Sequence, residues 1–289
     1  RTLPVETRGR KNGLSSTSAV DVDGNGTADR IYAGDLYGNL WVVDVSSSDP
    51  KDWGIAPEFK GKPLFTTGES QPITVRPSLI RHPTIKGSKQ PNLMVLFGTG
   101  TYREESEKAQ SLKQSFYGVW DRGRGALQRS HLVPQTFLLD NKKARVTDPH
   151  LKVDYASGRS GGVGGDYGWY IDLPAGQERV IYRSLVRDNL VYFNTLIPEK
   201  NSNLSAGWEM VVKTVNGGSP NDAAFDMDGD GKLSAKDAFT GVDAGKDKGC
   251  GFAGRKTDPD EYNPGAPAHA GDSGDKKLWL DSSKTDQTQ

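Results

Sequence analysis

The chain has 289 residues, of which 34% are hydrophobic, with 35 glycines and 16 prolines, and this composition favours short β-strands and many turns over long helices. Its 37 basic and 37 acidic side chains balance, so the net charge gives no reason to expect nucleic acid as a partner. The single cysteine, Cys250, excludes an intrachain disulfide, and the four histidines lack the spacing of a zinc site.

The first motif along the chain is an acidic loop, Asp21-Val-Asp-Gly-Asn-Gly-Thr-Ala-Asp29. Oxygen-bearing side chains occupy its positions 1, 3, 5 and 9, and Gly26 at position 6 permits a sharp turn. Carboxylates this close repel one another unless a cation lies between them, and Ca2+ tolerates irregular oxygen geometry. The predicted calcium ligands are Asp21, Asp23, Asn25, the carbonyl of Thr27 and Asp29.

A hairpin follows this loop directly. Residues 30–44 alternate apolar and polar side chains on both sides of Asp35-Leu-Tyr-Gly38, a pattern typical of two antiparallel strands. Similar strand-like segments recur downstream, at residues 93–100, 114–121, 168–173, 179–182, 189–196 and 207–212.

Strand, turn, strand units that end in an aromatic and an acidic residue, repeated every several tens of residues, are typical of a β-propeller. We therefore predict an all-β fold, a β-propeller, with a β-sandwich as the alternative. Stacked blades need aromatic side chains between them. The residues predicted to fill this role are Trp41, Trp120, Trp169 and Trp208.

Two segments between the strands carry no catalytic signal. Residues 101–115 are polar and predict a short helix or an inserted loop, whereas residues 157–165 are glycine-rich and predict a loop. This run lacks the Lys-Ser or Lys-Thr ending of a phosphate loop, and no helix is predicted after it, so nucleotide binding is not expected. We expect that the protein is not an enzyme.

A second acidic loop, Asp226-Met-Asp-Gly-Asp-Gly-Lys-Leu-Ser-Ala-Lys-Asp237, follows the EF-hand spacing more fully. A short helix over residues 235–239 is predicted after it, but Gly217-Gly-Ser-Pro220 prevents a helix before it. The loop therefore predicts half of an EF-hand, as in dockerins. Its predicted ligands are Asp226, Asp228, Asp230, the carbonyl of Lys232 and Asp237.

The alternative for either loop is an Asp-Gly turn without metal. If calcium binds, its role is either to hold the loop closed or to regulate the protein, and the sequence leaves both open.

The composition also predicts how the chain is divided. We expect propeller blades over residues 1–220, the second loop over 221–241, and a polar tail over 242–289 in which Leu278-Trp279-Leu280 forms a final strand. The first residues do not have the pattern of a signal peptide. We expect a mature fragment whose export signal and further domains lie upstream.

The segment Ser18-Ala-Val-Asp-Val-Asp-Gly-Asn-Gly-Thr-Ala-Asp-Arg-Ile-Tyr-Ala-Gly-Asp-Leu-Tyr-Gly-Asn-Leu-Trp41 resembles the C-terminal propeller domain of the PilC/PilY family of type IV pilus biogenesis factors and tip adhesins. The resemblance continues through Phe97-Gly-Thr-Gly-Thr-Tyr102, Ser115-Phe-Tyr-Gly-Val-Trp-Asp121, Gly168-Trp-Tyr-Ile-Asp-Leu173 and Thr195-Leu-Ile-Pro198. It covers most of the chain to about Asp237, and the tail after Gly241 departs from it.

This resemblance implies a partial, modified β-propeller with Ca2+ in the first loop. It also implies a location at the pilus tip or outer membrane surface of a Gram-negative bacterium, and roles in pilus extension or retraction and in adhesion. The partners it implies are minor pilins or other tip components, a host-cell or surface receptor, and the upstream part of the same protein. Two alternatives are a quinoprotein-type propeller dehydrogenase and a carbohydrate- or protein-binding module. The first is considered because the blade motif of those dehydrogenases is similar to the segment Tyr32-Ala-Gly-Asp-Leu-Tyr-Gly-Asn-Leu-Trp41.

Overall fold

The computed structural model describes residues 12–68, 70–86, 91–109, 111–142, 144–155, 166–198, 205–224 and 239–243, with the backbone alone at residues 105 and 205. These residues form three sheets and a two-stranded ribbon, β16 (Ile197–Pro198) with β17 (Ser205–Ala206). The second acidic loop with its predicted ligands, the glycine-rich run and the tail with its predicted final strand lie outside the described residues, apart from the edges of these segments.

The first sheet contains the predicted hairpin, which is confirmed as β2 (Arg30–Gly34) paired antiparallel with β3 (Asn39–Asp44). On one side β2 pairs with β1 (Ser18–Val20). On the other side β3 pairs with two short strands, β4 (Gly54–Ile55) and β5 (Phe65–Thr66). The last strand of the sheet, β9 (Leu127–Gln128), runs parallel to β5.

The carboxylate of Asp35, which is fully buried, holds the turn between β2 and β3. Its Oδ1 accepts the backbone N–H groups of Tyr37 at 2.9 Å and Asn39 at 2.8 Å. Its Oδ2 accepts the Asn39 side chain at 2.9 Å, the Trp41 indole N–H at 2.8 Å and the Asn12 side chain at 3.1 Å. A buried charge is costly unless it is hydrogen-bonded, and these five donors meet that need. Asp35 therefore stabilises the hairpin.

The second sheet has β7 (Leu93–Gly98) and β8 (Ser115–Asp121) at its centre, and every residue of both strands is buried. Its other strands are β6 (Ser78–Arg81), β13 (Gly168–Asp172) and β10 (Val133–Gln135), the last of which runs parallel to β13. The strands predicted near residues 93–100, 114–121 and 168–173 are therefore confirmed.

The third sheet is built around β15 (Leu190–Asn194) and β18 (Trp208–Lys213), which confirms two further predicted strands. Its remaining strands are β14 (Leu185–Arg187), β19 (Gly241–Asp243), β12 (Ala144–Thr147) and β11 (Phe137–Asp140). The strand predicted at residues 179–182 is wrong. Only Arg179 makes an isolated bridge, to Leu196, and Val180 instead packs into the space above Gly98, where a Cβ would lie 2.3 Å from it.

Helical structure in the described part of the chain is limited to short 3-10 turns, η1 (Pro57–Phe59), η2 (Glu105–Ala109) and η3 (Arg129–His131). The turn η2 falls within residues 101–115, where a short helix or an inserted loop is predicted. None of the helices in the described ranges is long and apolar enough to cross a membrane.

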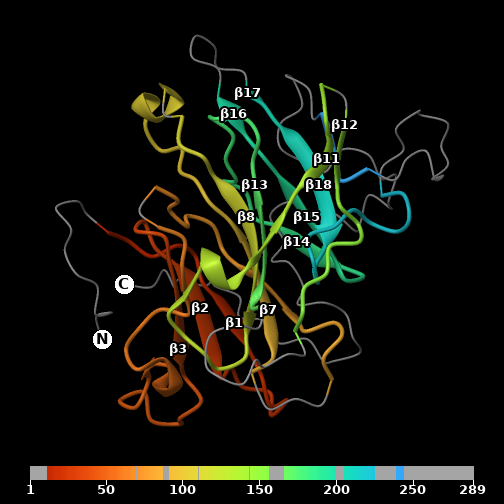
Figure 1. The fold of residues 1–289 in the computed structure, drawn as a ribbon. Helices are drawn as coiled ribbons and strands as arrows, with labels where there is room; N and C mark the ends of the chain where they lie inside the picture. The colour runs from red at the N-terminus through yellow and green to blue at the C-terminus, as the bar shows by residue number, and fades with distance from the viewer. Residues whose placement is uncertain are drawn as a thin grey trace, which may run out of the picture.

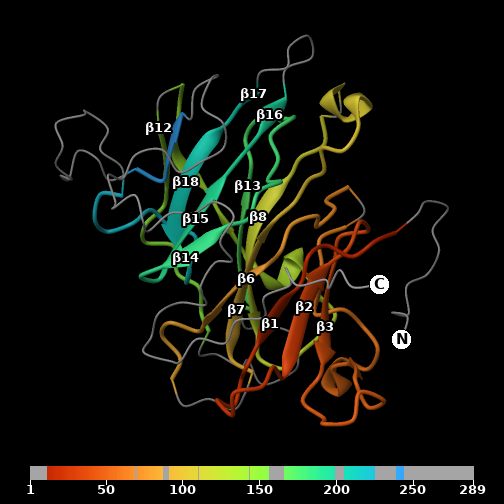
Figure 2. The same ribbon diagram turned by 180° about the vertical axis from the view of Figure 1, so that it is seen from behind.

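The three sheets stand side by side in Figure 1, where β2 and β3 mark the first sheet, β8 and β13 the second, and β15 and β18 the third. One edge strand of each sheet, β1, β6 or β14, lies toward the middle of the molecule, where these three inner strands come close together (Figure 2). Each contact includes a hydrogen bond from a serine at the start of one inner strand to the residue directly before the next. The Ser18 hydroxyl donates to the Pro77 carbonyl, and the Ser78 hydroxyl donates to the Ser184 carbonyl at 2.8 Å. This arrangement is that of adjacent propeller blades.

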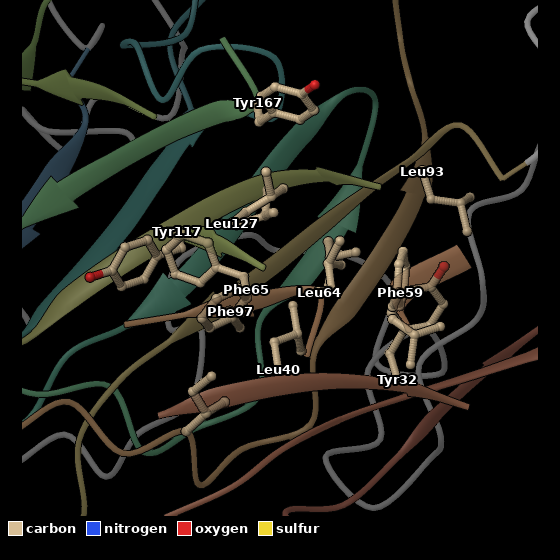
Figure 3. Close-up of a cluster of buried hydrophobic side chains, with 14 of the residues drawn as sticks. Tyr32, Leu40, Phe59, Leu64, Phe65, Leu93, Phe97, Tyr117, Leu127 and Tyr167 are labelled. Atoms are coloured by element: carbon tan, nitrogen blue, oxygen red, sulfur yellow. The ribbon is translucent and has the colours of Figure 1, made fainter. Parts of the chain in front are cut away.

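Apolar side chains fill both gaps between neighbouring sheets. The cluster between the first and second sheets contains Tyr32, Leu40, Phe65, Phe97 and Tyr117, all at most 1% exposed (Figure 3). A second cluster, which includes Phe116 stacked on Phe193 at a centroid distance of 3.9 Å, joins the second and third sheets. The burial predicted for the four tryptophans is confirmed, with 0–8% exposure at Trp41, Trp120, Trp169 and Trp208.

Candidate metal centre

The first acidic loop is the connection between β1 and β2, two strands whose pairing brings its ends together. The backbone N–H of Asp29 donates to the Val20 carbonyl at 2.9 Å and closes the base of the loop. Gly24 and Gly26 adopt φ angles of +83° and +92°. Residues with a side chain rarely adopt this left-handed conformation, so these two glycines allow the chain to turn twice within the loop.

Three of the five predicted ligands converge in this loop. Carboxylate oxygens of Asp21, Asp23 and Asp29 all lie within 4.8 Å of one another. In the described ranges, this is the only group of three or more His, Cys, Asp or Glu ligand atoms gathered so closely.

Backbone N–H groups point at Asp21 from inside the loop. Its Oδ1 accepts the N–H of Gly24 at 2.6 Å, and its Oδ2 accepts that of Gly26 at 2.7 Å. Desolvation opposes the charged form, but hydrogen bonds from the N–H groups of Gly26, Gly24 and Asn25 and the interaction with the Asp23 side chain together outweigh it and hold the pKa of the Asp21 carboxyl below its ordinary value. The loop therefore favours the ionised form of Asp21, the form that binds a cation.

Asp29 is the most buried of the three acids, at 8% exposure. Both hydrogen bonds that it accepts, from the backbone N–H of Val22 at 2.6 Å and of Asp23 at 3.2 Å, go to Oδ2. A carboxylate can bind Ca2+ through one oxygen alone, and Oδ1 of Asp29 can be that oxygen.

Asn25 and Thr27, the remaining predicted ligands, lie beside the carboxylates. The Asn25 side-chain amide donates to Asp23 Oδ2 at 3.0 Å. Its Oδ1 accepts both the backbone N–H of Thr27 at 2.8 Å and the Thr27 hydroxyl at 2.6 Å. An amide oxygen has two lone pairs, so ligation by Asn25 requires that the exposed Thr27 hydroxyl rotate away.

The residues fit a calcium ion by donor type and by spacing. All are hard oxygen donors, which Ca2+ prefers. Calcium–oxygen bonds of about 2.3–2.6 Å place two oxygens on opposite sides of one ion about 5 Å apart at most. The 4.8 Å limit that encloses the three carboxylates is within that span.

A contact that the sequence analysis missed joins this loop to the neighbouring sheet. The guanidinium of Arg81, at the end of β6, donates to the Val22 carbonyl at 3.1 Å. Val22 lies between two of the acids in the chain, and its own side chain is buried in the cluster between the first and second sheets.

The fold and this loop define a β-propeller-type domain with an acidic, oxygen-rich loop on its first described blade. The family model of the PilY1 beta-propeller domain matches residues 1–142. Across 83% of its length the chain is 30% identical to the type IV pilus biogenesis factor PilY1 of Pseudomonas aeruginosa strain PAO1, and across 72% it is 30% identical to a PilY1 homologue of Xylella fastidiosa strain Temecula1.

The fold agrees with these sequence matches. The crystal structure of the C-terminal domain of Pseudomonas aeruginosa PilY1 superposes with a TM-score of 0.66 at 27% identity, over 83% of this chain and 57% of that one. The chain belongs to the PilY1 family of type IV pilus biogenesis factors. It spans 24% of the Pseudomonas relative and 14% of the Xylella relative.

Proposed function

We propose that this chain is the calcium-binding propeller part of a pilus-tip protein that supports pilus extension against retraction and adhesion to host or other surfaces. The observation that carries the proposal is the convergence of Asp21, Asp23 and Asp29 within 4.8 Å, on a blade of a PilY1-type domain. A divalent cation relieves the repulsion among these carboxylates and fixes the loop that links β1 to β2.

The second acidic loop belongs to the same proposal. Its ligand pattern from Asp226 to Asp237 suits a second Ca2+, so the intact chain binds two ions. The proposed location is the extracellular face of a Gram-negative cell, at the pilus tip or outer membrane surface. The proposed partners are minor pilins or other tip components, a surface receptor and the upstream part of the same protein.

We propose a non-enzymatic role, although the Tyr32 to Trp41 segment also resembles the blade motif of quinoprotein dehydrogenases. Asp35, the acidic residue of that motif, is fully buried and accepts hydrogen bonds from the hairpin itself. This structural use accounts for the motif without a cofactor.

Isothermal titration with Ca2+ and a piliation assay test the proposal together. The wild-type chain should bind two ions, and Asp21→Asn/Asp29→Asn should bind one. Asp44→Asn is the matched control, because its carboxylate accepts surface hydrogen bonds outside the loop. When placed in the full-length protein, the double variant should reduce surface piliation. Normal piliation with the first ion lost would show that calcium only closes the loop, and a wild-type chain that takes up no ion would refute the proposal.

A further inference from the structure

The three inner strands share a sequence pattern, a serine followed by two apolar residues and then a charged residue. The charged residue is an acid in the first sheet and an arginine in the next two. The three segments are Ser18-Ala-Val-Asp21, Ser78-Leu-Ile-Arg81 and Ser184-Leu-Val-Arg187. Arg81 and Arg187 therefore occupy the position that the first candidate calcium ligand holds in the first sheet.

The two arginines make different contacts. Arg81 reaches back to the first sheet and donates to the Val22 carbonyl at 3.1 Å, within the acidic loop. Arg187 forms an ion pair with Asp188, its neighbour in the chain, at 3.4 Å, and both side chains are at least half exposed. Of these two arginines, Arg81 is the one whose contact connects a candidate calcium loop to the next sheet.

A single rigid peptide unit lies between Arg81 and the acids. The carbonyl of Val22 and the N–H of Asp23 belong to the same planar peptide group, so they move together. Arg81 holds the carbonyl end, and Asp29 Oδ2 accepts the N–H end at 3.2 Å. The N–H of Val22 also donates to Asp29 Oδ2, at 2.6 Å.

The side chain of Val22 adds a third constraint. It is 5% exposed and packs in the apolar cluster between the first and second sheets. A shift of Asp23 or Asp29 around an ion must therefore tilt a peptide unit that is anchored in the interface between the sheets.

We propose that Arg81 is a positioning residue that couples calcium loading of residues 21–29 to the second sheet, an inference that rests on the proposed calcium site. An ion fixes Asp23 and Asp29, these fix the peptide unit after Val22, and the Val22 carbonyl then holds the end of β6 through Arg81. Coupling of this kind is reciprocal, so Arg81 also favours the loop conformation that binds the ion.

Hydrogen–deuterium exchange of the 289-residue chain, with and without Ca2+, tests the coupling. In the wild type, Ca2+ should slow amide exchange both in residues 21–29 and in β6, the latter on the order of tenfold, as expected for one hydrogen bond to a charged group. In Arg81→Ala, Ca2+ should protect the loop but not β6, and Arg81→Lys should restore part of the effect. Arg187→Ala, at the equivalent position of the third sheet, is the control and should match the wild type.

The outcomes separate this inference from the proposed function. Equal calcium-dependent protection of β6 in Arg81→Ala and in the wild type would refute the coupling. A wild type in which Ca2+ protects neither segment and gives no heat of binding would instead refute the calcium site itself. If Arg81→Ala does not fold, Arg81→Met, which keeps the apolar stem and removes the donor, is measured in its place.

Discussion

Removal of the Asp35 carboxylate should destabilise the first sheet strongly. In Asp35→Ala, the five hydrogen-bond donors that surround this buried side chain lose their acceptor. Two of them belong to Tyr37 and Trp41, which are 2% and 3% exposed. A buried donor without an acceptor costs about 1–3 kcal/mol, so these two alone predict a loss of about 2–6 kcal/mol.

That loss is a large part of the roughly 5–15 kcal/mol that stabilises a domain. Urea unfolding followed by tryptophan fluorescence measures it. Asp35→Asn keeps one acceptor oxygen and should lose less than Asp35→Ala. Asp44→Ala, which removes a surface carboxylate, is the control and should change stability by less than about 1 kcal/mol. An Asp35→Ala variant as stable as this control would refute the reasoning.

Two other buried groups give predictions of their own. Glu178 is fully buried and binds the Arg145 guanidinium at 2.5 Å and 3.0 Å. Glu178→Ala leaves the buried Arg145 paired with the partly exposed Asp140, whose Oδ1 accepts from Nε at 2.9 Å, and should cost up to about 3–5 kcal/mol in urea unfolding. The double variant Arg145→Met/Glu178→Met removes both charges and should cost less than the single change; a greater cost would contradict this explanation. Burial lowers the pKa of His82 to about 4, so between pH 6.5 and about 4 the unfolded chain takes up a proton that the folded chain does not. Stability should therefore fall by about 2 kcal/mol from pH 7 to pH 5 through this residue, and His82→Phe should remove that part of the pH dependence, whereas the exposed-site control His150→Ala should not. Identical pH profiles for wild type and His82→Phe would overturn this assignment.

The sequence predicts the central strands of each sheet because their side chains are strongly patterned. The alternation around Asp35 and the apolar run of β7 are local signals of this kind. The strands at the edges of the sheets are harder to predict because they are short. In the second sheet, β6 has four residues, between Pro77 and His82, and β10 has three. Such short segments carry too few residues to define a period.

Local sequence patterns also do not predict contacts between segments that are far apart in the chain. The parallel pairing of Phe65 with Leu127 depends on the assembly of the whole sheet. The segment at residues 179–182 has apolar residues like a strand, yet Val180 fills the space above Gly98 and β14 takes the inner position instead. Tertiary packing decides such cases.

In the candidate site too, the contacts within one segment are predicted from the sequence and the contact between distant segments is not. The spacing of Asp21, Asp23 and Asp29 is local, so the sequence predicts their convergence. Arg81 lies 59 residues from Val22, and no nearby signal points to their hydrogen bond. Only the repeated serine-led pattern of the inner strands, once the sheets are known, relates Arg81 to the loop.

The most direct test of the calcium assignment is a crystal structure of the chain grown with Ca2+, with anomalous scattering measured at the first loop. The account predicts one anomalous peak about 2.3–2.6 Å from oxygens of Asp21, Asp23 and Asp29. A loop without a peak at millimolar Ca2+, its carboxylates separated and hydrated, would contradict it.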